Sequence, residues 1–153
     1  MSSLSDKAVK VAITQVGKQE KPLGSNWGIP VQDYLKSVGI THPASWCMAF
    51  VYWCYKQAAG TGKNPLVKTG GVLDAWNKAD KKNKVTKGPM SGDIMIMDHG
   101  KGLGHTGIVE KVDKNFIYTI EGNTNDTGSR EGIEVDRKRR PIVNKMIKGY
   151  LRY

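Results

Sequence analysis

Hydrophobic residues in the first half of the chain recur at the three- and four-residue spacing of an α-helix. Between Ala8 and Val16 they lie opposite a series of lysines, which predicts an amphipathic helix capped by Ser5 or Asp6 and ended by Gly17. The same period predicts further helices over residues 31–38, 45–59 and 72–79.

The helix predicted over residues 45–59 differs from the others because apolar side chains surround it. Ser45 is its expected N-cap, and Gly60 follows its last turn. A helix that is apolar on every face is typical of the buried centre of a domain. We therefore expect this helix to be central.

From Val85 onward the hydrophobic period changes to two, which is the period of a β-strand. Strands are predicted over residues 92–97, 106–112, 115–121, 133–136 and 148–153, and loops over residues 21–30, 61–71 and 81–84. Helices followed by strands indicate an α+β domain in which an antiparallel sheet packs on helices. The chain has 153 residues, of which 39% are hydrophobic, so residues 1–153 are predicted to form a single domain around one core.

Basic residues change this picture, because 24 lysines and arginines against 14 acidic residues give a formal net charge of +10. Solubility alone needs a net charge of only about 2–8 in a small domain, so a polyanionic partner is expected. Basic residues cluster at 81–87 and 137–140, which keeps a nucleic-acid or anionic-polymer binding module open as an alternative function. No helix-turn-helix, zinc finger or aromatic RNA-binding signature accompanies them, so nucleic acid is not the expected partner.

The longest apolar stretches, at residues 46–55 and 92–97, are shorter than the roughly 20 residues of a membrane span. No membrane span is therefore expected. The N-terminal residues also lack the basic and apolar regions of a signal peptide. If the protein acts outside the cell that makes it, we expect release by lysis or by a dedicated secretion route.

The chain has two cysteines, Cys47 and Cys54, both in the predicted central helix. Seven helical residues span about 10.5 Å, whereas disulfide-bonded Cα atoms lie about 4.4–6.8 Å apart, so no disulfide is expected between them. The spacing is also not that of a structural zinc site. Cys54 is interpreted as a buried apolar residue. Cys47 lies near the helix N-terminus, where the helix dipole stabilises a thiolate, and on position alone a nucleophile and a buried thiol are equally supported.

A cysteine nucleophile needs a histidine partner, and the chain has three histidines. His42 precedes a proline and His99 precedes a glycine-rich turn, so both are interpreted as loop or surface residues. His105 begins the predicted strand over residues 106–112 and is the candidate general base.

The register of the hairpin that follows His105 predicts its neighbours. A three-residue loop centred on Lys114 places His105 opposite Asn123 and Gly107 opposite Glu121, all on one face. Glu121 is then a diagonal neighbour within hydrogen-bond reach of His105. A bulge in the hairpin would turn Glu121 to the other face, and a carboxylate beside a strand histidine is more often a surface pair than a catalytic one.

Four short segments occur in a fixed order along the chain: residues 45–51 (SWCMAFV), 92–94 (GDI), 105–109 (HTGIV) and 120–123 (IEGN), preceded by residues 20–26 (EKPLGSN). In their order and spacing these segments closely resemble the CHAP family, the cysteine, histidine-dependent amidohydrolases and peptidases of bacterial cell-wall metabolism.

The resemblance implies a papain-like fold, with a cysteine at the start of a central helix and a histidine on the sheet. It implies that Cys47 is the nucleophile, His105 the general base, Glu121 the residue that orients the imidazole, and Asn123 a further polar residue of the site. The backbone N–H of Cys47 is the expected oxyanion donor. No cofactor is expected, and no metal either, because residues 41–45 carry no carboxylate, unlike the acidic loop of some calcium-binding relatives.

The resemblance also implies a peptidoglycan hydrolase that acts on the bacterial cell wall, in the periplasm or outside the cell. The bond cleaved is either the N-acetylmuramoyl-L-alanine amide or a peptide bond of the stem or cross-bridge, as in a phage endolysin, an antibacterial effector or a host remodelling enzyme. Anionic wall polymers are further expected partners, with an immunity protein if the chain is an effector, and the enzyme is expected to be a monomer. A papain-like protease acting on proteins is the other enzymatic alternative.

Overall fold

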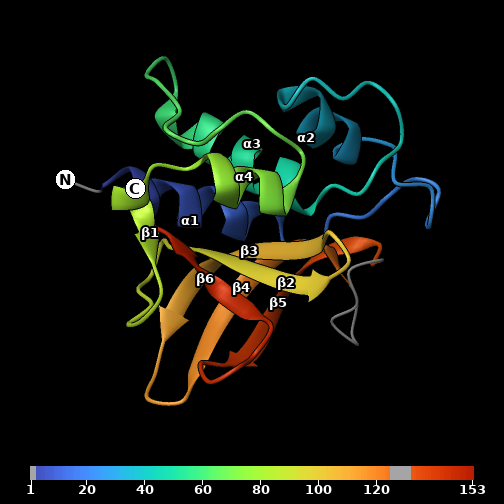
Figure 1. The fold of residues 1–153 in the computed structure, drawn as a ribbon. Coiled ribbons are helices and arrows are strands. Elements are labelled where there is room, and N and C mark those ends of the chain that lie inside the picture. The colour runs from blue at the N-terminus through green and yellow to red at the C-terminus, as the bar shows by residue number, and fades with distance from the viewer. Residues whose placement is uncertain (1–2, 125–131) are drawn as a thin grey trace.

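The computed structural model of the protein describes residues 3–124 and 132–153. Within these ranges helices gather on one side of an antiparallel sheet (Figure 1), which confirms the predicted α+β class. The helices are α1 (Leu4–Gln15), α2 (Val31–Ser37), α3 (Cys47–Ala59), α4 (Val72–Lys78) and the short 3₁₀ helix η1 (Lys81–Asn83). The strands are β1 (Lys84–Val85), β2 (Ile94–Gly100), β3 (Leu103–Val112), β4 (Phe116–Thr124), β5 (Glu134–Pro141) and β6 (Ile147–Leu151).

The six strands form one sheet in the order β1-β6-β2-β3-β4-β5, with antiparallel pairing throughout. The turn that joins β3 to β4 lies on the side of the molecule away from the helices (Figure 1). The distal parts of these strands therefore extend beyond the helical layer.

Helix α3 is the centre of the core, as its apolar pattern predicts. Trp46 and Phe50 are fully buried, and the ring of Tyr34 from α2 packs edge-on against Phe50 at 5.1 Å between centroids. Strand β4 approaches α3 closely at Gly122, where an added Cβ would lie 2.7 Å from the Trp46 ring and 2.9 Å from the Phe50 Cβ. Glycine at this position therefore lets the sheet lie directly against the start of α3.

The two faces of the sheet bury different residues because side chains alternate along each strand. In β2, Ile94 and Ile96 join the core with the helices, while Met95 and Met97 join a second, smaller cluster that includes Tyr150. The sheet is thus apolar on both faces near β2, which makes it a rigid support for the residues that it carries.

Two predicted helix starts are wrong. Helix α1 begins at Leu4 with Ser3 as its N-cap, because the Ser3 hydroxyl accepts a hydrogen bond from the Asp6 N–H. Helix α3 begins at Cys47 with Trp46 in the N-cap position and no side-chain cap, so Ser45 does not cap it.

Three predicted boundaries in the second half are also wrong. Strand β5 continues to Pro141 because residues 136–141 pair continuously with β4, so the basic run at 137–140 lies in a strand. Strand β2 extends to Gly100 and includes His99, which was expected in a turn. Residues 81–84, expected to be a loop, form η1 and the start of β1.

In the described part of the chain, helices are too short and too polar to span a bilayer. Cys47 and Cys54 are both buried and free, as their spacing in one helix requires.

Candidate active site

His105, near the start of β3, and Glu121, near the end of β4, form a buried hydrogen-bonded pair. The Nε2 atom of His105 lies 2.7 Å from Oε1 of Glu121, and both residues have an exposed fraction of 0%. Gly107 provides the space, because a Cβ there would lie 2.5 Å from the Glu121 Cγ. The predicted contact between these residues across one face of the hairpin is therefore confirmed.

Glu121 is held by Arg140, a residue for which the sequence predicts no role in the site. The Nε and Nη2 atoms of Arg140 donate to the two carboxylate oxygens of Glu121, each at 2.7 Å. The hydroxyl of Thr119 donates to the same carboxylate at 2.6 Å. Burial alone would raise the pKa of Glu121, but the hydrogen bonds from Arg140 and His105 outweigh it and lower the pKa to about 2. Glu121 is therefore an ionised buried carboxylate.

The imidazole of His105 lies between Glu121 and Cys47. Burial lowers the pKa of His105, but the interactions with the Cys47 thiol and the Glu121 carboxylate outweigh burial and raise the pKa to about 9. The carboxylate can only accept a hydrogen bond, so Nε2 of His105 carries the proton that is shared with Glu121. The Nδ1 atom is buried and has no well-formed hydrogen bond to the described residues, which leaves it as the ring nitrogen that can exchange a proton with the thiol.

Cys47 is the first residue of α3 and has an exposed fraction of only 4%. The first intrahelical hydrogen bond of α3 runs from the Phe50 N–H to the Trp46 carbonyl. The N–H groups that precede Phe50 in the helix are therefore not used within it, and they create a positive electrostatic environment around the thiol. Cys54 lies two turns deeper, where burial raises the pKa of its thiol and favours the neutral form.

The residue before Cys47 is held by a second buried carboxylate. Oε2 of Glu20 accepts a hydrogen bond from the Trp46 indole N–H at 2.7 Å, and Oε1 accepts one from the Gly24 N–H at 2.9 Å. Glu20 is 1% exposed. It thus connects residues 20–26 to the start of α3. The resemblance includes this segment, but the sequence predicts no role for Glu20, because a contact across 26 residues leaves no local signal.

Asn123 is buried two residues beyond Glu121, in a backbone conformation that the sequence did not predict. Its φ is +55°, and the pairing of β4 with β5 shifts between Glu121 and Thr124. Bulges of this kind are common next to active sites, where they change the direction of a side chain. The pairing of β3 with β4 extends to Ile108 and Ile120 and stops short of Asn123, so the position of Asn123 opposite His105 stays a prediction.

The other two histidines lie at the surface. His42 is exposed, with its Nδ1 atom 3.2 Å from the Pro43 carbonyl oxygen. His99 is exposed near the end of β2. Among the described residues no group of three or more His, Cys, Asp or Glu side chains is arranged to hold a metal ion.

The site thus combines a helix-terminal cysteine, a strand histidine and a fixed carboxylate, and comparison with known proteins assigns this arrangement to a family. The CHAP domain family model matches residues 39–123, which is more than half of the chain. The chain belongs to the CHAP domain family of hydrolases.

Solved structures share the fold at low sequence identity. The crystal structure of Ly7917 superimposes with a TM-score of 0.62 at 16% identity, covering 99% of this chain and 62% of that one. The wild-type endolysin LysIME-EF1 superimposes with a TM-score of 0.61 at 17% identity, covering 99% and 64%. A structure of Ly7917 with the hydrolyzing product of MDP gives 0.61 at 16% identity, covering 99% and 62%. The chain spans less than two thirds of the length of these proteins, and no curated protein sequence matches it significantly.

Proposed function

We propose that this chain is a peptidoglycan hydrolase that cleaves an amide bond by nucleophilic catalysis with Cys47. The observation that carries the proposal is the buried imidazole of His105 between the Cys47 thiol and the ionised Glu121 carboxylate. The raised pKa of His105 favours an imidazolium at neutral pH, which stabilises a thiolate at Cys47. A thiolate is the nucleophilic form of cysteine.

The proposed reaction begins when the Cys47 thiolate attacks the carbonyl carbon of the amide. The negative charge on the carbonyl oxygen is stabilised by the N–H of Cys47 at the start of α3. Nδ1–H of His105 then protonates the amine that leaves, and a thioester remains on Cys47. Water then attacks the thioester while Nδ1 of His105 accepts one of its protons, and the C–S bond breaks. The carboxylic acid product leaves, and the Cys47 thiolate and the His105 imidazolium are regenerated.

Glu121 and Arg140 support this cycle without touching the reacting bond. Glu121 holds the Nε2–H of His105 and stabilises the imidazolium by charge, and Arg140 holds Glu121 in place from the other side. Asn123 is proposed as a further polar residue of the site, because it is buried and follows Glu121 closely in β4.

Peptidoglycan is the proposed substrate for three reasons. The chain belongs to the CHAP family, its fold resembles that of an endolysin, and its net charge of +10 suits the anionic bacterial envelope. The bond is either the muramoyl–alanine amide or a peptide bond of the stem or cross-bridge. A role as a phage endolysin or antibacterial effector places the enzyme at the cell wall, in the periplasm or outside the cell.

The two cysteines provide a matched test of the catalytic assignment. Cys47→Ala should lower the release of soluble fragments from purified peptidoglycan by at least about a thousandfold, and His105→Ala should act similarly. Cys54→Ala removes an equally buried thiol from the same helix and should leave the rate within about twofold. Casein serves as the alternative substrate and should not be cleaved. A folded, active Cys47→Ala protein, or a folded but inactive Cys54→Ala protein, would contradict the assignment.

Mass spectrometry of the released fragments identifies the bond. A new N-terminal alanine on an intact stem peptide indicates an amidase. New termini within the stem or the cross-bridge indicate an endopeptidase.

A further inference from the structure

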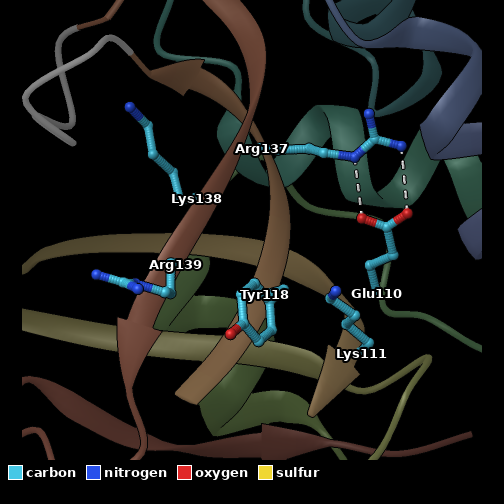
Figure 2. Close-up of a pocket in the computed structure, with 6 residues that line it drawn as sticks. All are labelled: Glu110, Lys111, Tyr118, Arg137, Lys138 and Arg139. Carbon is cyan, nitrogen blue, oxygen red and sulfur yellow. Dashed lines mark hydrogen bonds and ion pairs between the residues drawn. The ribbon is translucent and has the colours of Figure 1, made fainter. Parts of the chain in front are cut away.

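The distal parts of β3, β4 and β5 form a second polar site that shares no residue with the candidate active site. It is a groove with a volume of about 420 Å³ (Figure 2). We call it the basic groove; its lining residues are Glu110, Lys111, Tyr118, Arg137, Lys138 and Arg139. Four of these six residues are cationic and one is acidic.

Two of the four cations have carboxylate partners. Arg137 donates two hydrogen bonds to Glu110, at 3.0 and 3.2 Å, as Figure 2 shows. Lys138 lies 3.7 Å from Asp136. The positive charge of these two residues is therefore largely balanced within the protein.

The other two cations, Lys111 and Arg139, are exposed and lie against aromatic rings. The Lys111 ammonium is 4.6 Å from the centroid of Tyr118, and the Arg139 guanidinium is 4.5 Å from that of Phe116. In the described part of the chain no carboxylate forms an ion pair with either cation. Glu110, the acid next to Lys111 in sequence, pairs with Arg137. Asp113, two residues beyond Lys111, accepts its hydrogen bonds from the Tyr118 hydroxyl and from two backbone N–H groups.

The alternation of side chains in β5 explains why this site is separate from the active site. Arg140 faces Glu121 and is half-buried, whereas its neighbour Arg139 is exposed on the other face and contacts Phe116. The basic run at 137–140, which forms one cluster in the sequence, is therefore divided: Arg140 holds Glu121, and Arg137, Lys138 and Arg139 line the surface groove.

We propose that the basic groove binds an anionic phosphodiester polymer of the cell wall through Lys111 and Arg139. Exposed positive charges that form no ion pair with a described carboxylate are available to phosphate groups, and the contacts with the aromatic rings favour positions of these charges beside the rings. Each ring already carries a cation, so the groove offers no free aromatic platform of the kind that single-stranded nucleic acids use for base stacking. This favours a polyol phosphate that has no bases. The choice of the wall as its source rests on the proposed function.

The test measures binding without catalysis. The full chain carrying Cys47→Ala is titrated with purified poly(glycerol phosphate), and the affinity is compared with that of two double variants in the same background. Lys111→Gln with Arg139→Gln should weaken binding about 10- to 30-fold, because two cations next to an anionic polymer are lost. Lys81→Gln with Lys87→Gln changes the net charge equally in another exposed basic segment and should change affinity by less than about twofold.

A third variant separates charge from folding. Lys111→Arg with Arg139→Lys keeps both charges and should bind within about threefold of the parent. Equal loss of affinity in the groove variant and the Lys81 control, or no loss in either, would overturn the proposal. Tighter, groove-dependent binding of a single-stranded DNA of equal phosphate number would also overturn it, in favour of a nucleic-acid site. All these readouts stay informative if Cys47 proves not to be the nucleophile, because none depends on hydrolysis.

Discussion

Strand β5 contributes two arginines to two glutamates, and these pairs differ mainly in their exposure to water. Arg140 and Glu121 form two hydrogen bonds of 2.7 Å, with side-chain exposed fractions of 15% and 0%. Arg137 and Glu110 form the same bidentate pair at 3.0 and 3.2 Å, with exposed fractions of 52% and 22%. Both pairs are bidentate, but the loss of one partner should destabilise the fold more in the buried pair than in the exposed one.

The difference indicates that an ion pair holds a side chain in one position and one charge state only when water cannot take the place of the partner. Removing Arg137 leaves Glu110 partly in contact with solvent, which stabilises the carboxylate. Removing Arg140 leaves the Glu121 charge in the protein interior with only His105 and Thr119 as partners, and an unbalanced buried charge is strongly unfavourable. Arg140 therefore fixes the ionised state of Glu121, and Glu121 in turn fixes His105.

Removing each arginine separately should give the largest contrast between the two pairs. Arg140→Ala is expected to lower the free energy of unfolding by about 3–5 kcal/mol, because it leaves Glu121 uncompensated. Arg137→Ala should lower it by about 1 kcal/mol or less, because its partner is solvated. Urea denaturation monitored by tryptophan fluorescence measures both values.

A second variant distinguishes a buried charge from lost packing. Arg140→Met keeps much of the side-chain volume, and combining it with Glu121→Gln removes both charges. The double variant should recover part of the stability that Arg140→Met loses while remaining poorly active, because His105 no longer has a charged partner. A double variant that is less stable than Arg140→Met would contradict this account of the pair.

The protonation of His105 should make stability depend on pH. The folded pKa of about 9 is raised above the ordinary value of 6.5. The stabilisation is therefore fully present below about pH 6.5 and is lost as the pH rises towards 9, by on the order of 3 kcal/mol. Glu121 contributes in the opposite direction: its pKa is lowered, so its stabilisation is present above its ordinary pKa of 4.5 and is lost as the pH falls towards 2. The free energy of unfolding should therefore be greatest between about pH 4.5 and pH 6.5, where both contributions are present.

Cys47→Ala provides the control for the predicted loss of stability as the pH rises from 6.5 towards 9. It removes the thiol that helps to raise the pKa of His105, so the loss of stability between pH 6.5 and 9 should become clearly smaller. Denaturation curves at four or five pH values in this range are sufficient. An unchanged pH dependence in Cys47→Ala would mean that Cys47 and His105 do not interact as the structure indicates.

The contact between His105 and Glu121 could be predicted from sequence even though the predicted turn is wrong. The observed turn is centred between Lys114 and Asn115, because Val112 pairs with Ile117, and not on Lys114 as expected. The bulge at Glu110 shifts the pairing back by one residue. The shifted turn and the bulge cancel, so β3 and β4 pair beyond the bulge in the predicted register, with Ile108 opposite Ile120. Alternating hydrophobicity determines this face strongly, whereas the turn itself carries little sequence signal.

Arg140 could not be predicted in the same way, because its role depends on pairing between β4 and β5. The hydrophobic alternation that marks the start of β5 ends near Val135, and a run of basic residues resembles a solvated loop. Only the pairing of Glu121 with Asp136 aligns the two strands so that Arg140 reaches Glu121. Long-range polar contacts of this kind, like that of Glu20 with Trp46, leave no periodic pattern in the sequence.

Salt should separate the exposed charges from the buried ones in the activity of the enzyme. Raising the ionic strength from about 0.05 M to 0.5 M shortens the Debye length from roughly 14 Å to about 4 Å. Lysis of intact walls should then fall on the order of tenfold if exposed cations such as Arg139 hold the enzyme on the wall. Hydrolysis of a small soluble peptide fragment should change by less than about twofold, because the proposed catalytic residues Cys47, His105 and Glu121 are buried.

Charge variants locate the surface that causes this dependence. Glutamate substitutions at Lys111 and Arg139 should imitate high salt on intact walls and have little effect on the soluble fragment. The same substitutions at Lys81 and Lys87 should have a smaller effect on walls. If wall lysis does not respond to salt while Cys47 remains essential, recognition depends on the active-site surface alone and the exposed charges of β5 do not contribute.

The smallest expected effect is the energy of the exposed pair itself. A double-mutant cycle with Arg137→Ala and Glu110→Ala should give a coupling energy of about 0.2–1 kcal/mol at low salt, because solvent competes for both side chains. The coupling should approach zero at about 0.5 M salt, where screening is strong. The corresponding cycle with Arg140→Met and Glu121→Gln should give a coupling that is several times larger and nearly independent of salt, because neither partner is reached by ions. Equal coupling energies in the two cycles would mean that burial does not distinguish the pairs, and the positioning role of Arg140 would then have no energetic basis.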